Sequence, residues 1–203
     1  MTSAEALDRL RRERALVLLR AENISEAVLD AFVEGGLGAI EVSLVARDAT
    51  DTITRLRTRH PELLVGAGTV RTAAQAAAAT AAGAQYLISP AAAPEVAQWS
   101  RQHDILHVPA VLTPTEVDTA LRSGAPLLKL FPAARLGPGY VRDLRAPFPE
   151  VEFLASGGIS IGTVPDYLAA GVSVVGLGGA LAASSDPDEV RTLTQALVKA
   201  AHL

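Results

Sequence analysis

Eight short apolar runs, each followed by a helix-like segment, set the strongest limit on how this chain folds. The runs are 15–19, 39–42, 63–66, 85–88, 105–108, 127–130, 151–154 and 172–176. They recur at a spacing of roughly 22 residues, close to the minimum for a compact strand–loop–helix unit. The runs are continuously apolar rather than alternating, which is typical of parallel strands covered on both faces. Strict alternation produces either an open doubly wound sheet or a closed barrel, and eight even units favour an α/β fold of the (β/α)8 TIM-barrel class.

The segments between the runs predict the helices and the domain organisation. We expect helices over 24–34, 50–59, 72–82, 94–102, 114–122, 163–170 and 186–201, with a further segment around 139–144. Residues 4–14 have an amphipathic pattern and are extra to the eight units, so the stretch 1–14 is predicted to be an N-terminal capping helix at the bottom of the barrel. The sequence contains no linker or break in composition, which predicts one domain over 1–203.

The composition excludes several classes of function. The chain is 49% hydrophobic and carries a net charge of −4 with both signs interspersed; a nucleic-acid-binding surface would need a basic stripe. There is no cysteine, which excludes disulfides and thiolate metal sites. No apolar run approaches the ~20 residues that cross a bilayer, and residues 1–14 lack the apolar region of a signal peptide. We therefore expect a cytoplasmic protein that binds neither membrane nor nucleic acid.

A lysine lies inside one of the apolar runs, in Leu127-Leu128-Lys129-Leu130-Phe131-Pro132. All but two of the 18 basic residues are arginines, the exceptions being Lys129 and Lys199. Burying an ammonium is costly unless the group is paired or loses its proton. Unlike arginine, a desolvated lysine becomes a nucleophile that forms a Schiff base with a carbonyl. The alternative is a lysine that reaches solvent from the end of an edge strand.

The carboxyl ends of the strands, where barrel enzymes have their active sites, gather polar residues and glycines. These positions are Arg20, Glu41–Ser43, Gly66–Thr69, Ser89–Pro90, Pro109, Lys129–Pro132, Ser156–Gly158 and Gly176–Gly179. Glu41 is on the second strand and Lys129 on the sixth, so both side chains can point inward and meet across the axis. Such a carboxylate suits imine chemistry, since it can carry the protons that each step requires. The alternative is a buried ion pair that only fills the barrel.

Two glycine turns follow the seventh and eighth strands, at Gly157-Gly158 and Gly178-Gly179. Loops at these positions often bind phosphate through backbone N–H groups, although any tight strand-to-helix turn favours glycine. Arg20 ends the first strand and serves either as an anion-binding residue or in a surface salt bridge. His103 and His107 straddle a helix end and a strand with no acidic partner, so no metal site is expected.

Together these residues carry a resemblance to a known family. Ile40-Glu41-Val42, Val65-Gly66-Ala67-Gly68-Thr69-Val70, Ile88-Ser89-Pro90, Leu128-Lys129-Leu130-Phe131-Pro132-Ala133 and Ser156-Gly157-Gly158-Ile159-Ser160 occur in a specific order and spacing. The chain resembles, from about Leu16 to Leu181, the class I (Schiff-base) 2-keto-3-deoxy-6-phosphogluconate / 4-hydroxy-2-oxoglutarate aldolases, including the 2-keto-3-deoxy-6-phosphogalactonate branch.

The resemblance implies a lyase that reversibly cleaves a 4-hydroxy-2-oxo acid to pyruvate and an aldehyde. It implies that Lys129 forms the Schiff base and Glu41 is the proton shuttle. It also implies that Thr69 contacts the pyruvate carboxylate, that Pro90 and Phe131 wall the pocket, and that the glycine turns take the phosphate. The family further implies a homotrimer that needs no metal and no cofactor beyond the covalent lysine.

Three departures from the family pattern affect the substrate. Many members have an arginine where this chain has Val45, and that arginine holds the carboxylate. The galactonate branch also lacks it and has an arginine at the end of the first strand, so this resemblance implies Arg20 as the first candidate, with Arg47 as the second. Ala180 replaces a phosphate-binding serine, and Ala110 follows Pro109 where many members have glycine. The aldehyde partner is therefore either phosphorylated or plain. Two rival functions are a phosphate-binding barrel synthase or epimerase, in which Lys129 only orients an anion, and a non-catalytic keto-acid-binding barrel.

Overall fold

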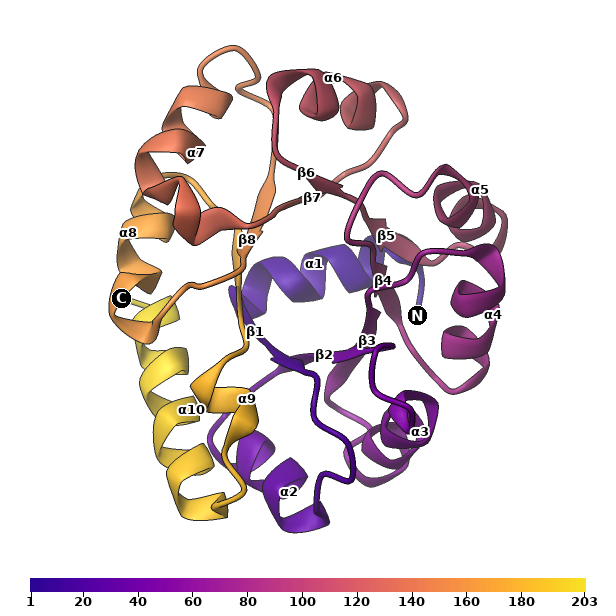
Figure 1. Ribbon diagram of the computed structural model, residues 1–203, viewed down its shortest axis with the longest axis vertical. Helices are drawn as coiled ribbons and strands as arrows, with labels where there is room; N and C mark the ends of the chain where they lie inside the picture. The colour runs from indigo at the N-terminus through magenta and orange to yellow at the C-terminus, as the bar shows by residue number, and fades with distance from the viewer.

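Parallel strands form a nearly closed ring at the centre of the molecule (Figure 1). The computed structural model describes residues 1–203, apart from the side chain of Ala180. In these residues nine strands form one sheet, in the order β5-β4-β3-β2-β1-β9-β8-β7-β6. Their bounds are β1 (Ala15–Leu19), β2 (Ala39–Ser43), β3 (Leu64–Gly68), β4 (Tyr86–Ile88), β5 (Leu106–Val108), β6 (Ala110–Val111), β7 (Leu128–Leu130), β8 (Phe153–Ser156) and β9 (Val174–Leu177). The predicted (β/α)8 barrel is confirmed.

The ninth strand arises because the fifth barrel position is split at Pro109. β5 pairs with β4, whereas β6 pairs with β7. Proline has no backbone N–H to give to a ladder, but the Pro109 carbonyl still accepts a hydrogen bond of 2.8 Å from the Lys129 N–H. The fifth predicted run ended at residue 108, so it missed the short strand beyond the proline, which reaches the strand carrying Lys129.

Helices surround the ring on its outer side (Figure 1). They are α2 (Glu26–Glu34), α3 (Ala49–Arg59), α4 (Ala73–Ala81), α5 (Pro94–His103), α6 (Pro114–Arg122), α7 (Gly137–Arg145), α8 (Val164–Ala169), α9 (Ala180–Ala183) and α10 (Pro187–Ala201), with short 3-10 turns η1 (Ala133–Arg135) and η2 (Ile161–Thr163). The predicted helices agree with these within two residues at most ends. The sequence pattern did not predict α9, which has only four residues. Among the described residues, no helix has the length and apolarity that crossing a membrane would require.

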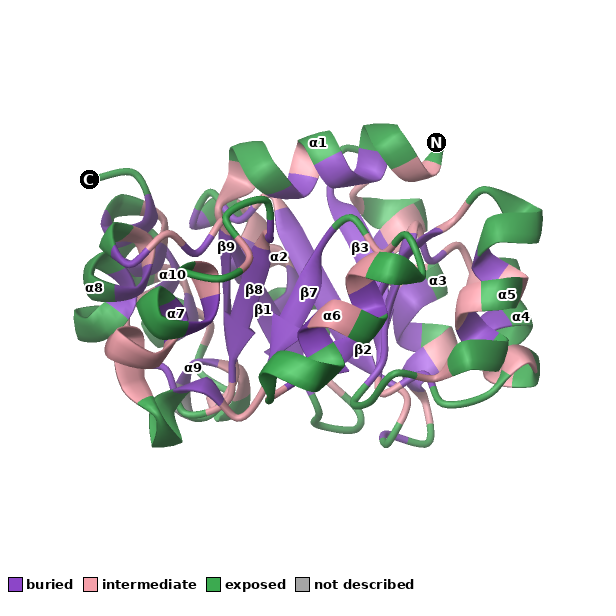
Figure 2. Ribbon diagram, turned by 90° about the horizontal axis from the view of Figure 1, so that it is seen from above, coloured by how far each residue is buried: buried purple, intermediate pink, exposed green. Residues whose placement is uncertain are grey.

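Helix α1 (Ser3–Glu13) lies across the amino ends of the strands (Figure 2). Thr2 and Glu5 form a capping box that starts it. It buries Ala6, Leu7 and Leu10 in the same apolar cluster as the inward-facing Leu16 and Leu154. Burial of apolar side chains stabilises this contact, and α1 therefore closes the end of the barrel opposite to the carboxyl ends of the strands.

Alternation along the strands decides which side chains enter the ring. On β2, Ile40 and Val42 pack outward in the cluster beneath the helices, whereas Ala39 belongs to the inner cluster. Successive strand residues point to opposite faces, which places Glu41 inside. On β7 the same rule turns Leu128 and Leu130 outward and Lys129 inward.

Candidate active site

Lys129 and Glu41 meet inside the barrel although strands β1, β9 and β8 separate their own strands. The Lys129 Nζ lies 3.7 Å from the Glu41 Oε1, which is an ion-pair distance rather than a hydrogen bond. Solvent reaches 6% of the Lys129 side chain and none of the Glu41 side chain. Neither Glu41 oxygen has a hydrogen-bond partner among the described residues. The Glu41 carboxyl oxygens are therefore available for hydrogen bonding, and the pair is almost completely shielded from water.

The environment of Glu41 favours its protonated form. Burial raises the pKa of the Glu41 carboxyl above its ordinary value of 4.5, and the positive charges of Lys129 and Arg20 oppose that rise. A carboxyl group with a raised pKa holds its proton more tightly than an ordinary glutamate and is a better match for general acid–base catalysis. The chemistry available to this pair is thus proton transfer beside a buried amine.

Two glycines on β3 create the space that Glu41 occupies. A Cβ at Gly68 would lie 1.8 Å from the Glu41 Oε1, and one at Gly66 would lie 2.3 Å from the Tyr86 ring. Tyr86 is fully buried and donates a 2.7 Å hydrogen bond to the carbonyl of Ile40, the residue before Glu41. Both glycines are thus needed because inner side chains from neighbouring strands cross over the backbone of β3.

Thr69 directly follows β3 in a left-handed conformation with φ of +60°. A β-branched residue rarely adopts this region, and strain of this kind often occurs at functional sites. Its Oγ1 lies 2.9 Å from the hydroxyl oxygen of Ser43, which ends β2 and is fully buried. The Glu41 strand and the Thr69 turn are therefore joined by a hydroxyl pair.

Phe131 lies near the Lys129 amine and lines two cavities. The Lys129 Nζ is 5.4 Å from the centre of its ring, within the range of a cation–π contact. Pro90 shares with Phe131 the wall of a cavity of about 650 Å³ between α5 and α6. Phe131 also borders a second cavity of about 950 Å³ at the carboxyl ends of β1, β8 and β9.

The second cavity brings together the glycine turns and Arg20. Its lining includes all four predicted turn glycines, Gly157, Gly158, Gly178 and Gly179. Gly157, Gly158 and Gly179 have φ of +96°, +83° and +61°. Side chains are disfavoured in that region, so the turns expose backbone to the cavity. The predicted effect of Ala180 concerns a side chain that lies outside the described part of the structure.

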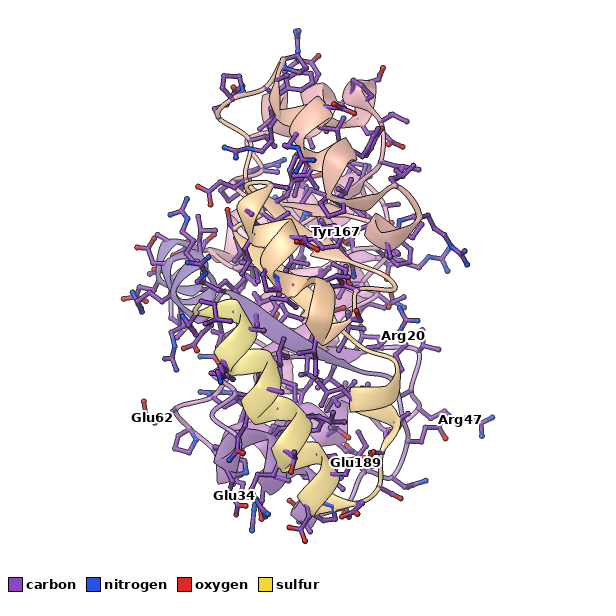
Figure 3. All side chains as sticks on the ribbon, turned by 90° about the vertical axis from the view of Figure 1, so that its left-hand side faces the viewer. Arg20, Glu34, Arg47, Glu62, Tyr167 and Glu189 are labelled. Carbon is purple, nitrogen blue, oxygen red and sulfur yellow. The ribbon has the colours of Figure 1, made fainter. Side chains whose placement is uncertain are left out.

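The two candidate arginines have different surroundings. Arg20 borders the second cavity and contributes positive potential at Glu41. The side chain of Arg47 is 94% exposed, with its Nε 4.0 Å from the Glu22 Oε1. Figure 3 shows Arg20 and Arg47 on the same side of the molecule, with Arg47 pointing outward. Arg20 is thus the candidate that borders the site.

The two histidines have separate structural partners. The His107 Nε2 lies 2.8 Å from the buried Ser89 hydroxyl, and burial lowers the pKa of His107 to about 4. The His103 ring stacks on Trp99 with the centres 4.0 Å apart. In the part of the chain that the structure describes, no group of three or more histidine, cysteine, aspartate or glutamate side chains is arranged to hold a metal ion.

Two further hydroxyl residues belong to the site but were not predicted to act. Ser43 follows Glu41 by two positions on the same inner face, and Ser156 borders the second cavity. Both lie at the carboxyl ends of strands, which is a signal available from the sequence. Serine is frequent at the ends of strands, so the residue type alone did not indicate a function for either position.

Comparison with known proteins gives consistent findings. A family model described as KDPG and KHG aldolase matches residues 7–195. Over 172 residues the chain is 34% identical to a 2-dehydro-3-deoxy-phosphogluconate aldolase of Treponema pallidum, covering 83% of this chain and 80% of the relative. Over 159 residues it is 37% identical to a probable 2-dehydro-3-deoxy-6-phosphogalactonate aldolase of Rhizobium meliloti, covering 77% and 75%.

A solved structure shares the fold and part of the sequence. It is the KDPG aldolase of Legionella pneumophila, described with pyruvate captured at low pH as a covalent carbinolamine intermediate. That structure superimposes with a TM-score of 0.83 at 26% identity and covers 97% of this chain and 96% of its own. The similarity thus extends over nearly the whole barrel.

Proposed function

Because the chain belongs to the KDPG and KHG aldolase family, whose members cleave a small 4-hydroxy-2-oxo acid to pyruvate and an aldehyde, we propose that Lys129 performs this cleavage through a Schiff base and that Glu41 transfers the protons. The observation that carries the proposal is the buried contact of 3.7 Å between the Lys129 Nζ and the Glu41 Oε1. The covalent carbinolamine in the Legionella pneumophila structure supports the same chemistry in a relative.

The proposed reaction begins at the C2 carbonyl of the oxo acid. The neutral Lys129 amine attacks this carbon, the carbonyl oxygen gains a proton, and the resulting carbinolamine loses water to give a protonated imine. The C4 hydroxyl then gives up its proton as the C3–C4 bond breaks. The bonding electrons move into the imine and leave an enamine, and the aldehyde departs. Reprotonation of C3 and hydrolysis of the imine release pyruvate and restore the amine.

Glu41 is proposed to carry these protons because it is the carboxyl group in contact with the amine. It accepts the proton that Lys129 must lose before attack, and it returns a proton when water leaves. Burial raises the pKa of Glu41, which favours the proton-donating form of the carboxyl group relative to an exposed glutamate. Exclusion of water from the pair strengthens the electrostatic coupling between the two groups.

The two ends of the substrate are proposed to occupy different parts of the site. Thr69 binds the pyruvate carboxylate, while Pro90 and Phe131 form the apolar wall. The glycine turns face the far end, where a phosphate or carboxylate of the aldehyde half would lie. Arg20 remains the first candidate for the pyruvate carboxylate, ahead of Arg47. We further propose a cytoplasmic homotrimer in which the lysine adduct replaces any cofactor, following the family resemblance.

Borohydride trapping tests the proposal with a control built into the sequence. Pyruvate and borohydride should attach one reduced pyruvate to Lys129, and Lys129→Ala should abolish both trapping and cleavage. Lys199, the only other lysine, is exposed on α10, so Lys199→Ala should trap and cleave as the wild type does. Turnover without trapping would favour the synthase or epimerase, and trapping without cleavage would favour the binding barrel. Full activity of Lys129→Ala would refute the mechanism.

A further inference from the structure

The backbone around Thr69 is fixed on both sides, which leaves its side chain as the adjustable part of the turn. The Leu44 N–H donates to the carbonyl of Gly68 at 2.9 Å, and the Val70 N–H donates to the carbonyl of Ile88 at 3.1 Å. These bonds hold the turn to the neighbouring strands β2 and β4. They constrain the left-handed φ of Thr69 but do not determine where its hydroxyl points.

Ser43 determines the direction of the Thr69 hydroxyl. Its side chain is fully buried, and its hydroxyl contacts the Thr69 Oγ1 at 2.9 Å. A buried hydroxyl without a partner is costly, so this contact is strongly preferred over alternatives in which the two side chains separate. Thr69 is only half-buried, so its second hydrogen-bonding direction remains available to a ligand.

We propose that Ser43 is a positioning residue for substrate binding, which acts by orienting the Thr69 hydroxyl. When the Ser43 O–H donates to the Thr69 Oγ1, the Thr69 O–H is free to donate to an anionic oxygen. The ligand class is the carboxylate of a 2-oxo acid, and this assignment rests on the proposed function. Ser43 itself touches no reacting atom, so its loss should weaken binding of the oxo acid and leave the chemical step nearly intact.

The position of Ser43 explains why the effect should be specific. Ser43 pairs with Gly68 in the β2–β3 register, and Glu41 pairs with Gly66. Glu41 and Ser43 are therefore successive inward-facing residues of β2, and the hydroxyl pair lies one layer closer to the carboxyl ends of the strands than Glu41 does. Removing the Ser43 hydroxyl therefore leaves Glu41 in place, together with the space that Gly66 and Gly68 provide for its side chain.

The test compares Ser43→Ala with two other substitutions. The measurement is the pyruvate concentration that gives half-maximal borohydride trapping at Lys129, with kcat for cleavage measured alongside. Ser43→Ala should raise that concentration about fivefold to tenfold, as expected for loss of one hydrogen bond, and should change kcat by less than about twofold. Ser43→Thr keeps the hydroxyl and should therefore show the half-saturating pyruvate concentration of the wild type. Thr194→Val is the matched control and should leave both quantities unchanged, because Thr194 is buried in α10 away from both cavities and its hydroxyl has no partner among the described residues.

A double variant separates positioning from a general structural effect. In a Thr69→Val background, Ser43→Ala should add less than about twofold, because the hydroxyl it orients is already gone. Unchanged half-saturation in Ser43→Ala, or full additivity with Thr69→Val, would overturn the inference. If Ser43→Ala does not fold, Ser43→Cys is titrated in its place with the same criteria. Failure of the wild type to trap pyruvate would instead refute the proposed function.

Discussion

Replacing Gly68 by alanine is the sharpest test of how β3 shapes the reacting centre. The added Cβ would lie 1.8 Å from the Glu41 Oε1, 2.5 Å from its Cδ and 2.7 Å from its Cγ. Three side-chain atoms therefore obstruct one methyl group, and the backbone of β3 is held in register on both sides. The carboxyl group has to leave its place opposite Lys129.

The size of the effect follows from two separate terms. Overpacking a well-filled interior costs typically ~1–3 kcal/mol, which for a domain of this size lowers Tm by roughly 2–12 °C. Displacing a general acid–base from its partner costs about 10²- to 10⁴-fold in rate. The expected variant is therefore folded, moderately destabilised and nearly inactive.

The test measures the thermal unfolding and the cleavage rate of Gly68→Ala. The control is a second glycine-to-alanine variant whose added Cβ also clashes with a neighbouring side chain. A Cβ at Gly35 would lie 2.6 Å from the Thr194 Cβ, between α2 and α10 and away from the site. Gly35→Ala should lower Tm to a similar extent and leave kcat unchanged. In the double variant Glu41→Ala/Gly68→Ala, the clash disappears, so stability should recover while activity does not. A Gly68→Ala protein with kcat within about threefold of the wild type would refute the assignment of Glu41, since the loss expected is at least 10²-fold.

The remaining predictions concern the distal turn and the charge of Glu41. Gly157→Ala should lower Tm and raise KM for cleavage about tenfold, because its Cβ would meet the Phe131 ring at 2.9 Å in addition to ~1–2 kcal/mol of left-handed strain. Gly137→Ala carries the same kind of strain, at φ of +77° with no atom within 4 Å, and should change only Tm; an equal change of KM in both variants would contradict the role of Phe131. Since burial raises the pKa of Glu41 above 4.5, the folded protein binds this proton more tightly than the unfolded chain does, and the contribution of Glu41 to stability falls as the pH rises from 4.5 through the raised pKa. Melts of the wild type and Glu41→Gln over this range should show the variant gaining relative stability with pH, and the opposite trend would contradict the direction of the shift.

The sequence was sufficient to predict the barrel because the same pattern, an apolar run followed by a helix, occurs eight times. Each continuous apolar run indicated a strand covered on both faces, and eight repeats left few alternatives. The errors are at positions where a local exception decides the structure. Pro109 divides one barrel position into β5 and β6. The strand β8 begins two residues later than its predicted run, because the Val151 N–H donates to the carbonyl of Phe148 in the preceding turn and not to a neighbouring strand.

The site was predictable where a residue type conflicted with its surroundings. Lys129 in an apolar run and Glu41 inside a strand are expensive to bury, so their presence required an explanation. Ser43 gave no such signal, because a serine at the end of a strand is common. The need for glycine at Gly68 depends on the length and direction of the Glu41 side chain on the neighbouring strand, which only the three-dimensional register defines.

The distribution of burial separates the Lys129–Glu41 pair from the cavity that is proposed to hold the distal end of the substrate. Glu41 and Lys129 are almost completely excluded from solvent, so their interaction is screened little and depends on exact packing. The glycine turns line the larger cavity and are partly exposed, so water and salt screen a charge bound there within about 10 Å of it. A change at the distal end of the substrate therefore alters contacts with the glycine turns and has little effect on the electrostatics of the amine. Substitutions at the distal turns should accordingly change which aldehyde half is accepted, whereas substitutions on β2 and β3 should change whether any carbon–carbon bond is cleaved.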